Sequence, residues 1–318
     1  MTIIWGTNYS IVKHAFREMD PQAFNAVRMA LGSAVFLSII FGLRRFGRRS
    51  VEGPGEAEAS PCETPSSEDS VASIFHSPAP ITRNDWLGLV GLGVVGHFFY
   101  QYLFISGLSQ TSVANSSLML AATPVAIALL SALLGQDRVS PLHWLGAALS
   151  LGGIYVVVGD GAALGSSSLR GDVTMFGAVF CWAVFTLGAR PLMKRHSPVG
   201  VTGVSMTIGT VLYVAALMPH LLTVEWAQVS AATWGALVYS ALFALCVSYT
   251  IWYAAVREIG SARTSVYSNI VPLVALATAV IFLGEPLGLT KSAGAAMVLI
   301  GVALTRVGRT KVPIPAEE

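Results

Sequence analysis

Three polar residues, His97, Tyr100 and Gln101, follow one another at helical spacing in an otherwise apolar segment. Residues three and four positions apart lie on the same face of a helix, so these side chains are expected to form one polar patch. An imidazole titrates at about pH 6.5 and could carry a proton, and an amide could hydrogen-bond a polar solute. The alternative for His97 is a neutral ring that hydrogen-bonds to a neighbouring helix.

Arg28 lies inside another apolar segment, seven residues after Pro21. Its planar guanidinium matches a carboxylate, so one interpretation is a clamp for a carboxylate on a bound solute. The other interpretation is a structural cation that extends to the membrane surface or bonds to carbonyls at a helix end. The sequence leaves both open.

The remaining candidates for a binding site are amide and aromatic side chains in apolar segments. An asparagine offers two donors and an acceptor, and tryptophan or tyrosine can stack on an aromatic or cationic group. Ordinary packing or anchoring at the membrane interface is the alternative for the aromatic residues. These candidates are Trp5, Asn8, Asn115, Trp182, Tyr249, Tyr253, Tyr267 and Asn269.

Two prolines, Pro124 and Pro272, fall midway through apolar segments. A proline in a helix lacks an N–H and clashes with the carbonyl four residues earlier, which for Pro124 belongs to Leu120. Carbonyls freed at membrane depth persist only where they meet a cavity, a partner or water. We interpret both prolines as hinges, with static kinks as the alternative.

Several classes of protein are excluded by what the sequence lacks. It contains no HExxH, GxSxG or P-loop pattern and no cluster of acidic ligands, so no metal, cofactor or catalytic site is expected. The cysteines, Cys62, Cys181 and Cys246, are scattered, and no basic patch suggests nucleic acid. All 17 acidic residues are expected in breaks, in a linker, in the tails or in terminal helical turns, which argues against proton exchange on a buried glutamate.

The elements that position these residues are expected to be membrane-spanning helices. Charged residues make up 11% of the chain, against about 25% in soluble domains, and the mean hydropathy is +0.66. Apolar runs recur at the length that a bilayer requires. They predict ten helices, near 1–17, 21–43, 86–106, 110–134, 142–159, 172–194, 199–219, 233–254, 261–283 and 289–306. Residues 44–85, rich in Ser, Pro and Glu, are expected to be a disordered loop.

An internal repeat divides the chain in two. A shift of 177 places Trp5 on Trp182, and a shift of 148 places Trp86 on Trp234 and Pro124 on Pro272. The predicted domains are a first repeat over 1–160, a second over 161–310 and a tail over 311–318. Because each repeat holds an odd number of helices, five, the two are expected to be inverted relative to each other.

The distribution of charge sets the expected orientation. With both termini in the cytoplasm, 14 of the 19 Lys and Arg residues fall in cytoplasmic breaks and four on the opposite side, as the positive-inside rule requires. A multi-pass protein of the inner membrane is therefore expected. The first apolar stretch lacks a signal-peptide pattern and is expected to be retained. Compared with the helix around Trp182, the helix around Trp5 is short at its start, which suggests a start at a residue before Met1.

Together, the ten helices, the midway prolines and two short motifs resemble the EamA-type branch of the drug/metabolite transporter superfamily. The motifs are Trp5-Gly6-Thr7-Asn8-Tyr9 and Gly284-Glu285-Pro286-Leu287. The first repeat departs from the family pattern, since it has Gln136-Asp137-Arg138 where a Gly-Glu pair would be expected. The resemblance implies a central cavity lined by helices 1, 3, 4, 6, 8 and 9, and export of amino acids or other small metabolites.

The expected function is therefore secondary transport of amino-acid-like or other small polar solutes by alternating access. Its partners would be membrane lipid and a small-molecule substrate, with proton coupling through His97 as a further hypothesis. The alternatives are a drug or nucleotide-sugar carrier, and a membrane scaffold or channel that does not transport. Glycines at positions 146, 153, 294 and 301 suit close helix packing inside the chain or, as the alternative, a homodimer face.

Overall fold

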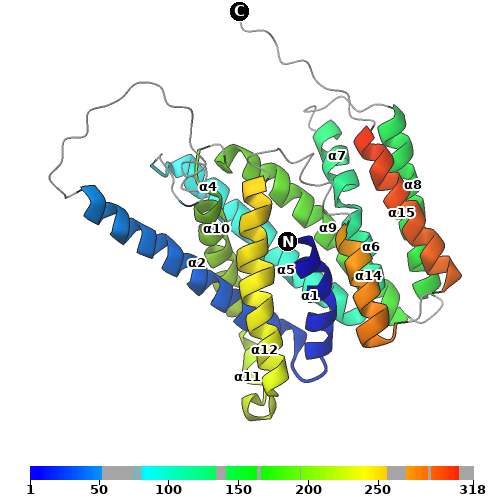
Figure 1. Ribbon diagram of the computed structural model, residues 1–318, viewed down its shortest axis with the longest axis horizontal. Helices are drawn as coiled ribbons and strands as arrows, with labels where there is room; N and C mark the ends of the chain where they lie inside the picture. Colours follow the sequence, from blue (N-terminus) through cyan, green and yellow to red (C-terminus); the bar gives the residue numbers. More distant parts are fainter. Residues whose placement is uncertain are drawn as a thin grey trace, which may run out of the picture.

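The computed structural model describes residues 1–51, 75, 80–133, 141–162, 166–193, 195–255, 270–285 and 288–307, and within these ranges the chain is helical with no strand (Figure 1). The α-helices are α1 (Thr2–Ala15), α2 (Pro21–Val51), α4 (Arg83–Leu92), α5 (Tyr100–Gln110), α6 (Val113–Ala121), α7 (Thr123–Leu133), α8 (Pro141–Ala162), α9 (Ser166–Met193), α10 (Pro198–Ala216), α11 (Met218–Leu222), α12 (Ala231–Tyr239), α14 (Ile270–Leu283) and α15 (Leu289–Val307). Two π-helical segments, η1 (Gly93–Phe99) and η3 (Ser240–Val247), and a short 3₁₀ turn, η2 (Trp226–Gln228), complete them.

Five helical stretches in the described part of the chain are long and apolar enough to cross a membrane: Pro21–Gly42, Arg83–Gln110, Leu169–Met193, Pro198–Ala216 and Ala231–Ala255. Shorter apolar helices include Ile270–Leu283 and Leu289–Leu304. Between 44% and 50% of each long stretch is buried, while large apolar side chains such as Phe282 and Leu289 lie on the outside. A helical bundle with an apolar exterior is built for lipid, because every helix satisfies its own backbone. The expected class, an all-α polytopic membrane protein, is confirmed.

Several of the helices have other bounds than those expected. α2 continues to Val51 instead of ending near 43, and α9 begins at Ser166 instead of 172. The single helix expected over 110–134 is divided into α6 and α7 around Ala122. An apolar run ends where the membrane ends, whereas a helix continues as long as its residues favour it, and arginine is a good helix former. The described part of the expected loop over 44–85 therefore includes the last turns of α2.

The two π-helical segments occupy related positions. A shift of 148 places η1, residues 93–99, on residues 241–247 of η3. Each continues directly into a regular helix, α5 after η1 and helical residues 248–255 after η3. The indole Nε1 of Trp5 donates a hydrogen bond of 2.9 Å to the carbonyl of Ala244 inside η3. π-Helical turns interrupt the regular backbone hydrogen bonding and are frequent at functional sites.

α8 and α15 lie side by side at the right of Figure 1 and cross at their glycines. A Cβ on Gly153 would lie 2.7 Å from the carbonyl oxygen of Gly294, and one on Gly301 would lie 2.5 Å from that of Gly146. At the crossing, the Ser150 hydroxyl donates to the Val298 carbonyl at 3.2 Å. These glycines thus pack the two helices against each other inside the chain, as the first of the two interpretations expected.

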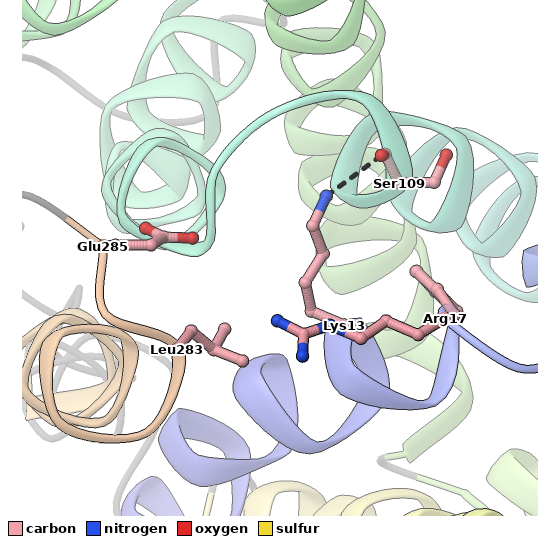
Figure 2. A pocket seen from close by; sticks show the side chains of 6 residues that line it. Lys13, Arg17, Ser109, Leu283 and Glu285 are labelled. Atoms are coloured by element: carbon pink, nitrogen blue, oxygen red, sulfur yellow. Dashed lines mark hydrogen bonds between the residues drawn. The ribbon is translucent and has the colours of Figure 1, made fainter.

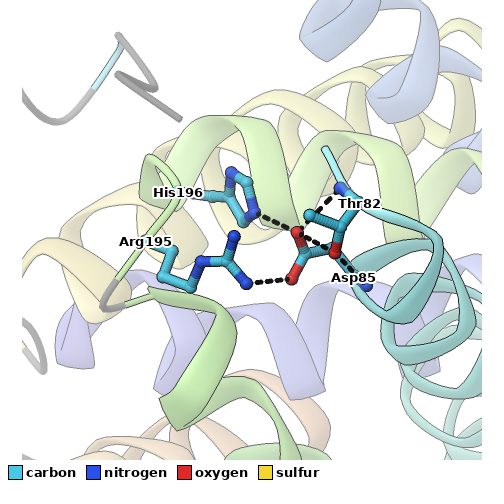
Figure 3. A network of polar contacts seen from close by, with 4 residues as sticks. All are labelled: Thr82, Asp85, Arg195 and His196. Atoms are coloured by element: carbon cyan, nitrogen blue, oxygen red, sulfur yellow. Dashed lines mark hydrogen bonds and ion pairs between the residues drawn. The ribbon is translucent and has the colours of Figure 1, made fainter. Parts of the chain in front are cut away.

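Two ends of the bundle are defined by their turns: the α1–α2 end, with the turn over residues 16–20, and the α9–α10 end, with the turn over 195–197. At the α9–α10 end, the Asp85 carboxylate caps α4 together with Thr82 and lies 3.2 Å from both Arg195 and His196 (Figure 3). This contact joins the start of α4 to the turn between α9 and α10.

The α1–α2 end has an equivalent contact. The Glu18 carboxylate accepts a hydrogen bond of 2.7 Å from the Thr233 hydroxyl and one of 3.2 Å from the Ser230 amide, at the start of α12. Arg195 is 177 positions after Glu18, and Thr233 is 148 positions after Asp85. Equivalent positions of the two repeats therefore contact each other at both ends of the bundle. The acidic residue is Glu18, on the turn, at one end and Asp85, at the start of a helix, at the other.

The Glu18 contact predicts a pH-dependent stability. Hydrogen bonds from Ser230 and Thr233 lower the pKa of the Glu18 carboxyl below its ordinary value of 4.5. Because the folded pKa is the lower one, the stabilisation is complete above the unfolded-chain pKa and is lost as pH falls through the folded pKa. We expect the wild-type Tm to drop as the pH falls from about 5 to about 3, and Glu18→Gln to have a lower Tm at pH 7 and a smaller drop over that range. The exposed Glu225→Gln is the control; an unchanged pH profile in Glu18→Gln would contradict the prediction.

Candidate functional site

A buried aromatic cluster lies between α1, α9 and the helical residues 248–255. The Trp5 ring centroid is 6.3 Å from that of Trp182, 5.9 Å from that of Tyr249 and 5.6 Å from that of Trp252. The ring centroids of Tyr100 and Trp182 are 5.0 Å apart. The structure thus brings together four residues that the sequence indicated separately, Trp5, Tyr100, Trp182 and Tyr249.

His97 lies on η1 against this cluster. The centroid of its ring is 5.0 Å from that of Phe185 and 5.9 Å from that of Tyr249, and its side chain is fully buried. Neither ring nitrogen has a hydrogen-bond partner among the described residues. The described part of the structure therefore does not show the alternative expected for His97, a hydrogen bond to a neighbouring helix.

Arg28 is buried beside the same cluster, 2% exposed. Its Nη2 donates to the Gln101 side-chain oxygen at 2.8 Å, and its Nη1 donates to the Ser240 hydroxyl at 3.0 Å. Its Nε has no hydrogen-bond partner in the part of the chain that the structure describes. The side chain therefore neither extends to the surface nor bonds to a helix end, in contrast with the structural interpretation. Gln101 comes from α5 and Ser240 begins η3, so Arg28 links α5 to η3.

Buried polar atoms without hydrogen-bond partners recur around this region. Burying such an atom without a partner costs about 1–3 kcal/mol, so a group of them indicates positions that a polar ligand would satisfy. Such atoms belong to His97 and Arg28, and among the described residues also include Asn8 Oδ1, Ser248 Oγ, Trp252 Nε1 and the Tyr253 hydroxyl. Asn8 and Tyr253 were predicted, and the ring of Tyr253 lies 6.1 Å from that of Tyr249.

Asn115 is held nearer the α1–α2 end of the bundle. Its amide nitrogen lies 3.4 and 3.5 Å from the carboxylate oxygens of Asp172, which also accepts a hydrogen bond of 2.5 Å from the Thr111 hydroxyl. Asp172 is fully buried and lies six residues after the first residue of α9. The expectation that every carboxylate falls in a break or a terminal turn is therefore wrong for Asp172, because α9 begins before the apolar run does.

The sequence-predicted hinges are partly described. α6 ends at Ala121 and α7 begins at Thr123, just before Pro124. The carbonyl of Leu120 accepts a hydrogen bond of 2.6 Å from the Thr123 hydroxyl, so the carbonyl expected to be freed does find a side-chain partner. Pro272 is buried near the start of α14. Tyr267 and Asn269 lie outside the described residues.

A separate pocket of about 290 Å³ opens at the α1–α2 end, lined by Lys13, Phe16, Arg17, Ser109, Leu283 and Glu285 (Figure 2). The Lys13 ammonium donates to the carbonyls of Leu108, Ser109 and Thr111, at 2.6, 2.9 and 2.9 Å, at the C-terminus of α5. The Glu285 carboxylate accepts from the amides of Val113 and Ala114, at 2.7 and 3.1 Å, at the N-terminus of α6.

Each charge in this pocket has the sign that the adjoining helix end favours. Gly284 has φ of +65°, a conformation that suits glycine and turns the chain so that the next carboxylate reaches α6. The Gly284-Glu285 motif thus ends α14 and caps α6. We conclude that this pocket is built from helix caps and is distinct from the site around Trp5 and Arg28.

A helical membrane protein whose buried centre carries a cation, an imidazole and unpaired polar atoms is organised as a transporter rather than as a soluble enzyme. The chain matches the EamA-like transporter family over residues 70–159 and 169–307, and it belongs to that family. It is a membrane transporter, and the family resemblance seen in the sequence is confirmed.

Relatives of this chain carry the same description. It is 25% identical over 315 residues to the uncharacterized transporter YyaM of Bacillus subtilis, which covers 98% of this chain and 92% of that protein. It is 24% identical over 309 residues to an uncharacterized transporter of Archaeoglobus fulgidus, covering 95% and 93%. A solved structure described as "Crystal structure of protein" matches with a TM-score of 0.60 at 18% identity, over 98% of this chain and 96% of that one, and shows a likeness in fold.

Proposed function

We propose that this protein is a secondary transporter that moves small polar organic solutes, amino acids or compounds like them, by alternating access. Under this proposal the chain forms ten transmembrane helices as two inverted repeats of five, 1–160 and 161–310. Both termini lie on the cytoplasmic side of the inner membrane. The solute would occupy the site around Trp5, Arg28 and Tyr249.

Contacts between residues related by the repeat offsets are the observation that carries the proposal. Trp5 packs on Trp182, and the Ser33 and Thr210 hydroxyls lie 2.8 Å apart; both pairs are 177 positions apart. Ser150 bonds to Val298, 148 positions later. A residue can touch its own repeat equivalent only near the axis that relates the two repeats. These contacts therefore support a pseudo-two-fold axis through the middle of the molecule.

Such symmetry supports a carrier, because equal and opposite halves provide both access states from one architecture. The Asp85 contact at one end and the Glu18 contact at the other occupy equivalent positions, so opening one end and closing the other is an exchange between similar arrangements. The site between them draws Gln101 from one half and Ser240 from the other. A movement of the halves would change its shape directly.

His97 is the residue that would carry a coupling proton in this proposal. The groups that face its ring are Phe185 and Tyr249, and no carboxylate contacts it among the described residues. An anionic solute bound beside the ring would favour the protonated imidazole. That relation would link protonation to solute binding.

The rival functions make different demands. A nucleotide-sugar carrier needs several cations for its phosphates, whereas Arg28 is the fully buried cation around the aromatic cluster in the described part of the chain. A channel or scaffold needs no buried groups that lack partners. Purified protein in liposomes should show solute counterflow that saturates with concentration, measured with labelled neutral amino acids against empty liposomes. Flux that rises linearly with concentration, or no flux for any solute class, would contradict the carrier.

A further inference from the structure

We infer that Arg28 is the anchor for the carboxylate of the transported solute, and that the site takes organic monoanionic groups attached to an apolar body. This inference rests on the proposed transport function and specifies its substrate chemistry. Gln101 and Ser240 hold the guanidinium in position, and the aromatic cluster around Trp5 receives the body of the solute.

The first step of the argument is an uncompensated charge. Arginine stays charged in proteins, and moving a cation out of water costs several kcal/mol unless an anion compensates it. Among the residues that the structure describes, both hydrogen-bond partners of Arg28 are neutral and its Nε has no acceptor. The titratable groups that act most on it are the phenols of Tyr249, Tyr213 and Tyr100. In the described part of the chain no carboxylate pairs with Arg28, and a carboxylate on a bound ligand would supply the countercharge.

The second step is the absence of an equivalent in the other repeat. The residue 177 positions after Arg28 is Ser205, which is fully buried and bonds to carbonyls of its own helix, those of Val201 and Thr202. The equivalents of Gln101 and Ser240 are Tyr249 and Leu92. Helix packing works in the second repeat without a cation at this position. The guanidinium is thus a departure from the shared scaffold, as a specificity determinant would be.

The third step limits the charge and shape of the solute. A single guanidinium fits one carboxylate through paired N–H donors, and its free Nε is one of the donors such a fork uses. Beside it, the indoles of Trp5, Trp182 and Trp252 present apolar faces. A carboxylate with an apolar body satisfies both halves of the site, whereas a dianion would leave a second charge unpaired.

The test compares matched ligands that differ in the carboxylate alone. L-leucine is paired with L-leucinamide and hexanoate with hexanamide, with inorganic phosphate as a non-carboxylate anion. Binding to the purified protein is followed by the fluorescence of the site tryptophans and by the shift in Tm. We expect each carboxylate to bind tighter than its amide by roughly tenfold to a hundredfold, the range for a charge-assisted hydrogen bond. Phosphate binding as tight as hexanoate would overturn the inference.

Two variants separate a solute anchor from a structural residue. Gln101→Glu supplies an internal countercharge to Arg28, so it should hold or raise Tm while abolishing the preference for carboxylates. Arg28→Gln should lose the same preference without a fall in Tm. Arg170→Gln, at an exposed arginine of α9, is the control for loss of charge and should keep the preference.

A structural Arg28 would give the opposite pattern. Arg28→Gln would then lower Tm, or weaken carboxylates and amides alike, and Gln101→Glu would leave the preference intact; any of these results overturns the inference. The proposed transport function fails separately. Wild-type protein that binds hexanoate but shows no saturable flux would refute the carrier and keep the anchor. Saturable flux of amides and carboxylates alike would keep the carrier and refute the anchor.

Discussion

His97→Leu is expected to slow transport by about tenfold or more while the protein becomes no less stable. The substitution removes two buried nitrogens that have no hydrogen-bond partners within the described ranges, a change worth about 1–3 kcal/mol in favour of the folded state. Leucine also occupies the equivalent position in the second repeat, Leu245, 148 residues later. The scaffold is therefore known to accept leucine at this place in a π-helical segment.

The expected loss of transport comes from removing the same two nitrogens. A polar atom kept unpaired inside a fully buried aromatic environment costs stability in every molecule, so its retention indicates a use for it. In the proposed carrier, that use is contact with the solute or with a coupling proton. Replacing the imidazole with an apolar chain of similar size removes both and leaves the packing in place.

Two measurements on one sample check this prediction. Initial rates of counterflow in proteoliposomes give the transport effect, and Tm in detergent gives the stability effect. Leu245→Met is the matched control, since a volume-conserving change at an apolar position costs less than about 1.5 kcal/mol and should leave the rate within a small factor. Wild-type rates in His97→Leu, or a fall of its Tm below that of Leu245→Met, would show that the imidazole serves packing.

The polar face of the third apolar segment could be predicted because helical periodicity is local. His97, Tyr100 and Gln101 were placed on one face from their spacing, and in the structure all three point into one region: His97 onto Tyr249, Tyr100 onto Trp182 and Gln101 onto Arg28. The π-helical segment η1, which contains His97, was not predicted. It packs against α10 and α9, which lie far from it along the chain.

Contacts between residues that lie far apart along the chain could not be predicted from the sequence pattern. Ser240 is an ordinary serine in an apolar run, and only the fold places it at Arg28. Asp172 was expected near a helix start, yet it is buried against Thr111 and Asn115. The Gly284-Glu285 motif was identified by resemblance, but its physical role, capping α6 from another helix, requires the tertiary structure. In each case the missing information is the partner, which lies far away along the chain.

Gly153→Leu is expected to destabilise the packing of α8 against α15 strongly. A Cβ at Gly153 would already lie 2.7 Å from the Gly294 oxygen and from the Val298 nitrogen, and 2.9 Å from the Met297 Cβ. Backbone atoms cannot move aside as a flexible side chain can, so the helices would have to separate. Forcing extra atoms into a packed interior costs about 1–3 kcal/mol or more, which exceeds the gain of less than about 1 kcal/mol from replacing a helical glycine.

The neighbouring glycine provides the matched control. A Cβ at Gly152 would meet only the terminal methyl of Met297, at 3.5 Å, so Gly152→Leu should fold as wild type or slightly better. Tm and the yield of monodisperse protein should therefore fall for Gly153→Leu and not for Gly152→Leu, and equal values would refute close contact between α8 and α15. Because none of the described contacts of the Trp5 and Arg28 site comes from these two helices, transport per folded molecule should change little in either variant. A fall in the rate per folded molecule would instead mean that the crossing moves during the transport cycle.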